Sequence, residues 1–371
     1  MIKAEILADS KNQFGNRITT MKVTMPRIIL AEFNTHRMFS RNSASSRAIP
    51  FEKMYNTVNA TPFIPIAWQK DHKGMQGSEY ITRESEIKFC RDEWLRARDK
   101  ALEQSIQLQT SNVTKQLCNR LLEPFMWQTV IVTATEWENF FALRCPKYIH
   151  KTGNEVNEYR NWKDLISHLE SLSEEYIDNW KNESVLQRLL HSKGQAEIHM
   201  MALAEVMWDA YNESTPRLLK AGEWHIPFGD KIDNDYICID LLGWDKYRKD
   251  IADTKINEYK IAISTAMCAR VSYTTIGEEN KKANYSKDVD LHDKLAASGH
   301  MSPFEHCARA MSNNEYYNHI NGVVECNRNQ LYGDEEKIQQ ISIIDKQSFG
   351  WSGNFRGFVQ YRKMIPNENI L

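Results

Sequence analysis

The N-terminal part of the chain contains short segments in which apolar and polar residues alternate. Ile2 to Leu7 and Arg17 to Val23 follow the two-residue period of a β-strand, and Ile28 to Phe33 is an apolar run of strand length. Residues 49–80 follow no period and are expected to be irregular. This pattern predicts that the chain begins with a β-sheet.

Later segments repeat their apolar residues every three or four positions, which is the period of an α-helix. The segments that predict helices are Glu84 to Leu122, Glu136 to Leu143, 162–181, 194–211, Ile256 to Val271 and Asp288 to Ser298. Thr129 to Thr133 predicts one more strand, whereas Lys147 to Asn161 shows no period and is expected to be an insertion loop. Strands and long helices together indicate an α/β (α+β) fold with a mixed, twisted sheet.

Composition and charge narrow the classes of partner. The 371 residues carry 47 basic and 49 acidic side chains, so the whole chain has no signature of binding double-stranded nucleic acid or a membrane. An anionic ligand must therefore meet a local cluster of cations. The seven cysteines form no C-x-x-C pair, and no stretch reaches 18 consecutive apolar residues. Both features predict a soluble cytoplasmic protein with free thiols.

The segment from His36 to Arg47 has a composition that no hydrophobic core requires. Its twelve residues include one imidazole, three guanidinium groups, four hydroxyls and one amide. Guanidinium and hydroxyl donors at this density suit the oxygens of a bound phosphate. A solvated polar loop is the other interpretation that composition allows.

A second polar segment runs from Gly299 to His306. Gly299 fits a helix C-cap and Pro303 fixes the following turn. The turn presents four polar side chains close together, namely His300, Ser302, Glu305 and His306. No H-E-x-x-H motif or Cys/His cluster accompanies them, so we predict no metal site; buried structural histidines are the ordinary alternative.

A third candidate is Arg144, which ends the apolar run Asn139 to Leu143, with Arg120 earlier in the chain. An arginine at the end of an apolar helix commonly extends its charged group into solvent. The alternative is that it contacts a ligand.

The patterns H-R-x-x-S-x-N-x-x-S-x-R and G-H-x-S-P-F-E-H, at residues 36–47 and 299–306, resemble the signatures of the flavin-dependent thymidylate synthases. The resemblance implies FAD-dependent transfer of a one-carbon unit from methylenetetrahydrofolate to C5 of dUMP, giving dTMP, with NADPH reducing the flavin. It also implies a homotetramer. Two alternatives stay open: a flavin-dependent hydroxymethylase of dUMP or dCMP, and a non-catalytic relative that binds nucleotides or RNA.

The resemblance also implies roles for individual residues. Arg144 would lie beside the uracil ring and His300 near the flavin ring, both as catalytic residues. The pyrimidine nucleotide would be bound by Ser43, Ser45, Arg47, Arg120 and Arg144. FAD would be bound by His36, Arg37, Thr133, Thr135, Asn139, Ser272, Ser302 and Glu305.

The order of the motifs departs from the family, because the G-H-x-S-P-F-E-H turn follows the Arg/Ser segment instead of preceding it. The chain therefore resembles a circular permutation of the family, with 1–371 as a single intertwined catalytic domain. Residues 1–230 would form the nucleotide-binding half and 231–371 the half with the flavin turn. The permutation predicts that the strand after His306 lies beside the strands leading into His36.

Three positions depart from the family's residues. Thr35 stands where the family has an arginine, Ser43 where it has a glutamate, and Ala48 where it has an aromatic residue. The candidates to supply the missing positive charge are Arg41, Arg356 and Arg362.

Overall fold

The structure, a computed structural model, describes residues 2–73, 77, 79–152, 154–172, 178–243, 249–273, 284–318, 353–366 and 368. Its centre is a five-stranded sheet in the order β3-β4-β2-β1-β7. The strands are β1 (Lys3–Asn12), β2 (Arg17–Pro26), β3 (Ser40–Ser43), β4 (Trp127–Ala134) and β7 (Arg217–Leu219). Only the β1–β7 pair is parallel, so the sheet is mixed, and the predicted fold class is confirmed.

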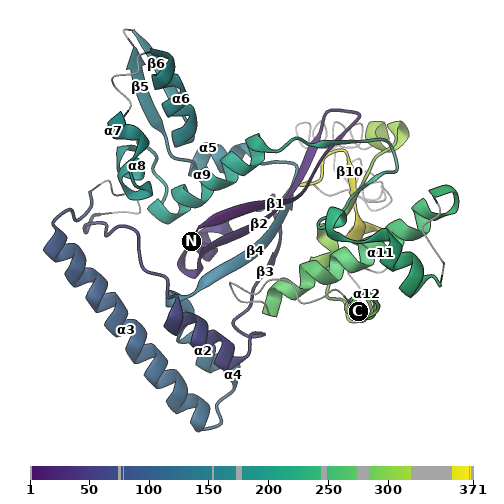
Figure 1. The fold of residues 1–371 in the computed structure, drawn as a ribbon, viewed down its shortest axis with the longest axis horizontal. Coiled ribbons are helices and arrows are strands. Elements are labelled where there is room, and N and C mark those ends of the chain that lie inside the picture. The colour runs from purple at the N-terminus through teal and green to yellow at the C-terminus, as the bar shows by residue number, and fades with distance from the viewer. Residues whose placement is uncertain are drawn as a thin grey trace, which may run out of the picture.

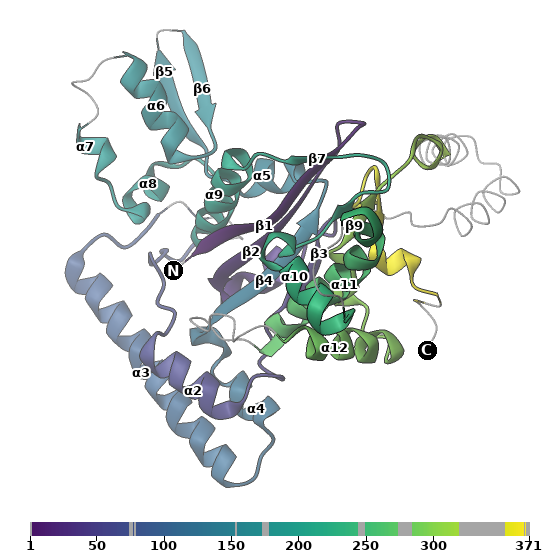
Figure 2. The ribbon, with the colours of Figure 1, turned by 45° about the vertical axis from the view of Figure 1, so that its right-hand side comes forward.

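Helices cover both faces of this sheet (Figure 1, Figure 2). They are α1 (Leu30–Phe33), α2 (Phe51–Ala60), α3 (Glu84–Thr110), α4 (Lys115–Arg120), α5 (Glu138–Arg144), α6 (Trp162–Leu172), α7 (Asp178–Lys181), α8 (Val185–His191), α9 (Ile198–Glu213), α10 (Asn234–Tyr236), α11 (Lys249–Arg270) and α12 (Tyr285–Ala297). Among the described residues, none of these helices combines the length and hydropathy that a membrane span requires.

Successive side chains along β2 and β4 point to opposite faces of the sheet, and different helices pack on the two faces. Met21, Val23 and Val132 point to one side, where they pack with Phe140 of α5 and Leu203 of α9. On the other side, Leu7 and Ile131 pack with Cys268 in the last turn of α11 and with Val271 just after it. The sheet is therefore buried between α5 and α9 on one face and α11 on the other.

Three expectations about secondary structure were wrong. The run Ile28–Phe33 is not a strand, because its buried residues are Ile29, Leu30 and Phe33, the spacing of one helical face. Residues 49–80 include helix α2. The expected loop at 147–161 is a hairpin of β5 (Tyr148–Thr152) and β6 (Glu155–Tyr159).

A second sheet has three strands in the order β10-β9-β8, with β8 at Trp224–His225, β9 at Ala308–Ala310 and β10 at Phe358–Gln360. The strand after His306 was expected beside the strands leading into His36. Ala308 and Ala310 of this strand, β9, do pack with Ile18 of β2, but β9 pairs with β8 and β10 and not with the main sheet. The main sheet is also contacted by the short helix η7 (Ser302–Glu305) and by His306.

A chain of buried polar side chains connects the two sheets. His225 of β8 is hydrogen-bonded through Nδ1 to Ser10 (2.9 Å) and through Nε2 to Thr20 (2.8 Å). The Thr20 hydroxyl contacts the Thr133 hydroxyl at 2.7 Å, and Thr133 contacts His306 Nδ1 at 2.8 Å. Burial lowers the pKa of both histidines to about 3, so both are neutral in the native protein near pH 7.

These histidines make stability depend on pH. Their native pKa lies below the unfolded value of about 6.5, so the unfolded state binds more protons as pH falls through that value. We expect His306→Asn, which keeps a polar atom near Nδ1 but does not titrate, to remove about 2 kcal/mol of the destabilisation between pH 7 and pH 5. Urea unfolding of both proteins at several pH values measures this difference, and parallel pH profiles would contradict it.

Candidate functional site

A cavity of about 860 Å³ lies where strand β4 ends and helix α5 begins, and it is called here the first cavity. Four predicted site residues line it, namely His36, Arg37, Asn139 and Arg144. Thr35 and Arg356 line it as well. The structure therefore brings together residues that are far apart in the sequence.

Aromatic packing builds the two walls of the first cavity. Phe39 lies between the turn that carries His36 and Arg37 and the start of α5, with ring centroids 4.7 Å from Trp137 and 5.2 Å from Phe140. The Trp137 indole donates to the Ala134 carbonyl at 2.9 Å, which fixes the turn between β4 and α5. Because Phe140 faces the core, Asn139 is turned outward into the cavity.

Arg144 is held in place at the cavity wall. Its Nη1 forms an ion pair with Glu32, and its Nε donates to His36 Nε2 at 3.0 Å. Its side chain is 22% exposed, so it does not simply extend into solvent. Because arginine only donates, His36 Nε2 must accept, and the proton of the neutral imidazole is on Nδ1.

The electrostatics agree with a neutral His36. Burial, followed by the positive charges of Arg144 and Arg41, lowers the pKa of His36 to about 4. Burial also raises the pKa of Glu32, an effect that the Arg144 charge opposes. The Arg41 charge is close enough to lower this pKa because Arg41 Nη1 donates to the His36 carbonyl at 3.0 Å.

The residues around the first cavity suit a ligand with both aromatic rings and phosphates. Arg37, Arg144 and Arg356 supply positive charge, while the exposed side chains of Met38 and Leu143 supply apolar surface. The volume lies within the range of about 300–1,000 Å³ that is usual for cofactor sites. The residues present therefore fit FAD. Within the described ranges, no three acidic, histidine or cysteine side chains gather as metal ligands.

Two smaller cavities continue from the first around helix α1. One of about 580 Å³ shares Thr35 and Arg37 with the first cavity and reaches Ser43. The other, of about 430 Å³, shares Ala31 and Asn34 with the cavity of about 580 Å³ and reaches Glu123. A trough thus leads from Arg144 past Arg37 toward the far end of β3 and the segment that follows α4.

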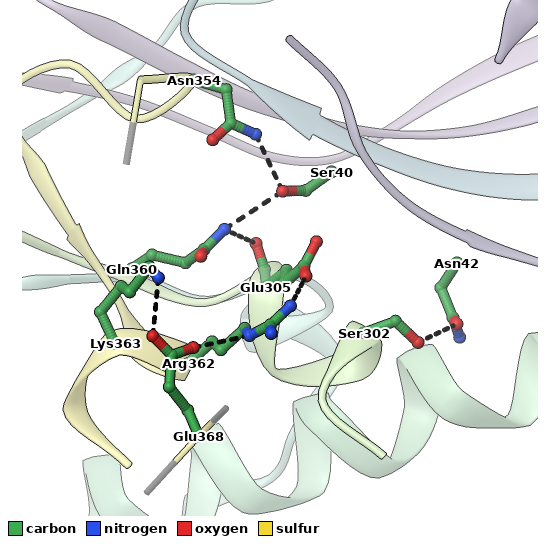
Figure 3. Close-up of polar contacts among 9 residues, drawn as sticks. All are labelled: Ser40, Asn42, Ser302, Glu305, Asn354, Gln360, Arg362, Lys363 and Glu368. Atoms are coloured by element: carbon green, nitrogen blue, oxygen red, sulfur yellow. Dashed lines mark hydrogen bonds and ion pairs between the residues drawn. The ribbon is translucent and has the colours of Figure 1, made fainter. Parts of the chain in front are cut away.

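The turn at 299–306 lies directly against β3 (Figure 3). The Ser302 hydroxyl donates to Asn42 Oδ1 at 3.2 Å, and Asn42 Nδ2 donates to the Cys268 carbonyl. Glu305 forms an ion pair with Arg362. The two sequence motifs are therefore adjacent, although Ser302, Glu305 and the exposed His300 do not line the first cavity.

Arg47 and Arg120 lie near the start of β4, the end that is farther from the first cavity. The two ends of this eight-residue strand are about 23 Å apart at roughly 3.3 Å per residue. The Asn119 amide donates to the Ser46 and Ile49 carbonyls, which holds the Arg47 loop against the end of α4. Both arginines are exposed, and within the described part of the chain neither guanidinium has a hydrogen bond or an ion pair. We call them the Arg47–Arg120 pair.

The other predicted residues make contacts within the fold. Thr133 is buried in the polar chain between the sheets. Thr135 Oγ1 accepts from the Arg356 backbone N–H at 3.0 Å. The Ser272 carbonyl accepts from the Ser45 N–H at 2.8 Å. None of the three lines the first cavity, and their contact with FAD stays a prediction.

Sequence reasoning missed Glu32, the ion-pair partner of Arg144. A signal existed, because Glu32 is the one charged residue inside the apolar run from Ile28 to Phe33. An acidic side chain at such a place usually has a partner.

Removing the Arg144 guanidinium should raise the pKa of His36. Arg144→Ala removes both a nearby positive charge and a donor that binds only the neutral imidazole at Nε2. An NMR titration of the histidine ring carbons measures the change, with Arg144→Lys as the control that keeps the charge. An unchanged His36 titration in Arg144→Ala would contradict the contact.

Known proteins offer only distant comparisons. The sequence matches no protein-family profile and no curated protein. Among solved structures it is similar to the UMP/dUMP methylase PolB from Streptomyces cacaoi bound with 5-Br UMP, with a TM-score of 0.32 and 16% identity, over 39% of this chain and 76% of that chain. A second PolB structure, bound with 5-Br dUMP, gives a TM-score of 0.37 and 12% identity, over 57% of this chain and 90% of that chain. Neither likeness assigns a function to this chain.

Proposed function

We propose that this protein is a flavin-dependent enzyme that transfers a one-carbon unit from methylenetetrahydrofolate to C5 of dUMP, giving dTMP. The observation that carries the proposal is the meeting of His36, Arg37, Asn139 and Arg144 around one cavity of about 860 Å³. The arrangement of the two sequence motifs against β3 supports it.

His36, Arg37 and Asn139 would hold FAD in the first cavity. FAD, when bound and reduced by NADPH, supplies the hydride that the methyl product requires. Arg37 would neutralise phosphate charge, since its guanidinium is exposed at the cavity wall. Met38 and Leu143, which are exposed at the cavity, would provide the apolar surface that excludes water.

Arg144 would stabilise negative charge that develops on the pyrimidine ring, including at N3. Its guanidinium is already oriented by Glu32 and His36, so no reorganisation is needed when that charge forms. His36 has a pKa of about 4 and is neutral near pH 7, so it acts by positioning Arg144 and not as a proton donor.

The 5′-phosphate of the nucleotide would bind the Arg47–Arg120 pair together with Ser45. Within one chain this pair lies at the far end of β4 from the first cavity. A homotetramer in which a neighbouring chain brings its basic pair to this cavity would join the two regions. The trough past Ser43 offers the alternative path within one chain.

The first test is cofactor content and product. We expect purified protein to bind FAD and show its absorption band, and Asn139→Ala to weaken that binding by removing a cavity-wall amide. Incubation with dUMP, methylenetetrahydrofolate and NADPH, followed by mass spectrometry, should give dTMP.

Other outcomes of this test discriminate among functions. A hydroxymethylated product from dUMP or dCMP would keep the site and change the reaction. Protein that stays colourless after addition of FAD would contradict the flavin proposal and favour a non-catalytic nucleotide-binding protein.

The basic pair should distinguish a nucleotide from a nucleoside. Arg47→Ala or Arg120→Ala should weaken dUMP binding roughly 30- to 150-fold, because a charge-assisted contact to phosphate is lost. Binding of deoxyuridine should change little in either variant. Arg83→Ala, at the exposed residue that precedes α3, is the matched control. Equal losses for dUMP and deoxyuridine would mean that these arginines do not contact the phosphate.

A further inference from the structure

A segment near the C-terminus is anchored beside the first cavity on both sides of one exposed arginine. Phe355 and Phe358 are fully buried and pack with Ile18, Leu219 and Ala308. Arg356, between these anchors, has a side chain that is 60% exposed and lines the first cavity. The packing therefore fixes the backbone while leaving the guanidinium accessible.

Hydrogen bonds fix the same backbone more precisely. The Thr135 N–H donates to the Asn354 carbonyl at 3.0 Å, and the Arg356 N–H donates to Thr135 Oγ1 at 3.0 Å. The Asn354 amide donates to the Ser40 hydroxyl at 2.9 Å (Figure 3). Gly357 has a φ of +75°, and a Cβ there would lie 2.2 Å from Asn12 Nδ2. Arg356 is thus presented at one place on the cavity wall.

The present partner of Arg356 is weak. Its Nε lies 3.3 Å from Glu136 Oε1, in a pair whose side chains are 60% and 32% exposed. Exposed pairs of this kind contribute little to stability, so an anionic ligand can replace Glu136 at small cost. Arg37 lines the same cavity, and its guanidinium has no hydrogen bond or ion pair among the residues that the structure describes.

The other two arginines that could supply this charge are already engaged elsewhere. Arg41 is half-buried and donates to the His36 carbonyl. Arg362 forms ion pairs with Glu305 and Glu368 (Figure 3). Neither lines the first cavity.

We infer that Arg356 and Arg37 together form a binding site for a pyrophosphate group in the first cavity, with Arg356 supplying the positive charge that Thr35 lacks. The identification of that group as part of FAD rests on the proposed function. The site itself depends only on the two guanidinium groups that line one cavity.

Flavins that differ in phosphate content test the site on the full chain. In fluorescence titrations, Arg356→Ala should weaken FAD binding about 10- to 100-fold and change riboflavin binding less than twofold. Arg356→Lys should keep most of the FAD affinity. Thr35→Arg combined with Arg356→Ala should recover FAD affinity, because it returns a cation to the same cavity. Arg83→Ala is again the control.

Inorganic pyrophosphate separates this inference from the proposed function. If the wild type binds pyrophosphate but no flavin, and Arg356→Ala abolishes that binding, the proposed function fails and the anion site stands. If FAD and pyrophosphate bind equally well to the wild type and to Arg356→Ala, the inference fails and the flavin proposal stands. Wild-type protein that binds neither probe overturns both.

Discussion

The hydroxyl of Thr133 is shared between Thr20 and His306, and the relation between the two sheets depends on this contact. The hydroxyl lies in a fully buried position, where an unpaired polar group would be costly. Both neighbours must therefore stay within hydrogen-bond reach, which fixes the turn at 299–306 above β4. Ser302 of that turn donates a hydrogen bond to Asn42 of β3. The position of the turn therefore fixes the position of β3 and of the residues before it.

The sequence was sufficient to predict the fold class and most helices, because long amphipathic segments have a clear period. It failed where a short apolar run fits two periods, as in Ile28–Phe33, which is helical. It also failed for β9, because strand pairing between distant segments leaves no local signal: Ala308 and Ala310 pair with residues near 224 and 358. Tertiary partners decided those cases.

Part of the candidate site was predictable because its polar residues are clustered in the sequence. Clustered guanidinium and hydroxyl groups at 36–47 stand out in composition, and the structure places His36 and Arg37 at the first cavity with Asn139 and Arg144. The sequence could not separate these from Thr133, whose buried side chain connects the sheets. The sequence also could not show that Arg356, and not Arg362, lines the cavity. Arg362 is engaged in an ion pair with Glu305, and that contact is visible only in the structure.

The anchored C-terminal segment has a consequence for the order of folding. Asn12, Ser40 and Thr135 are contacted by residues more than 200 positions later, with separations of 345, 314 and 221 for three of the hydrogen bonds. Contacts across such long loops form slowly, because chain closure must precede any stabilising gain. During synthesis the N-terminal strands therefore emerge long before the segment that completes the cavity. Until then, the end of β4 and the Ile18 side chain lack the contacts that cover them in the native protein.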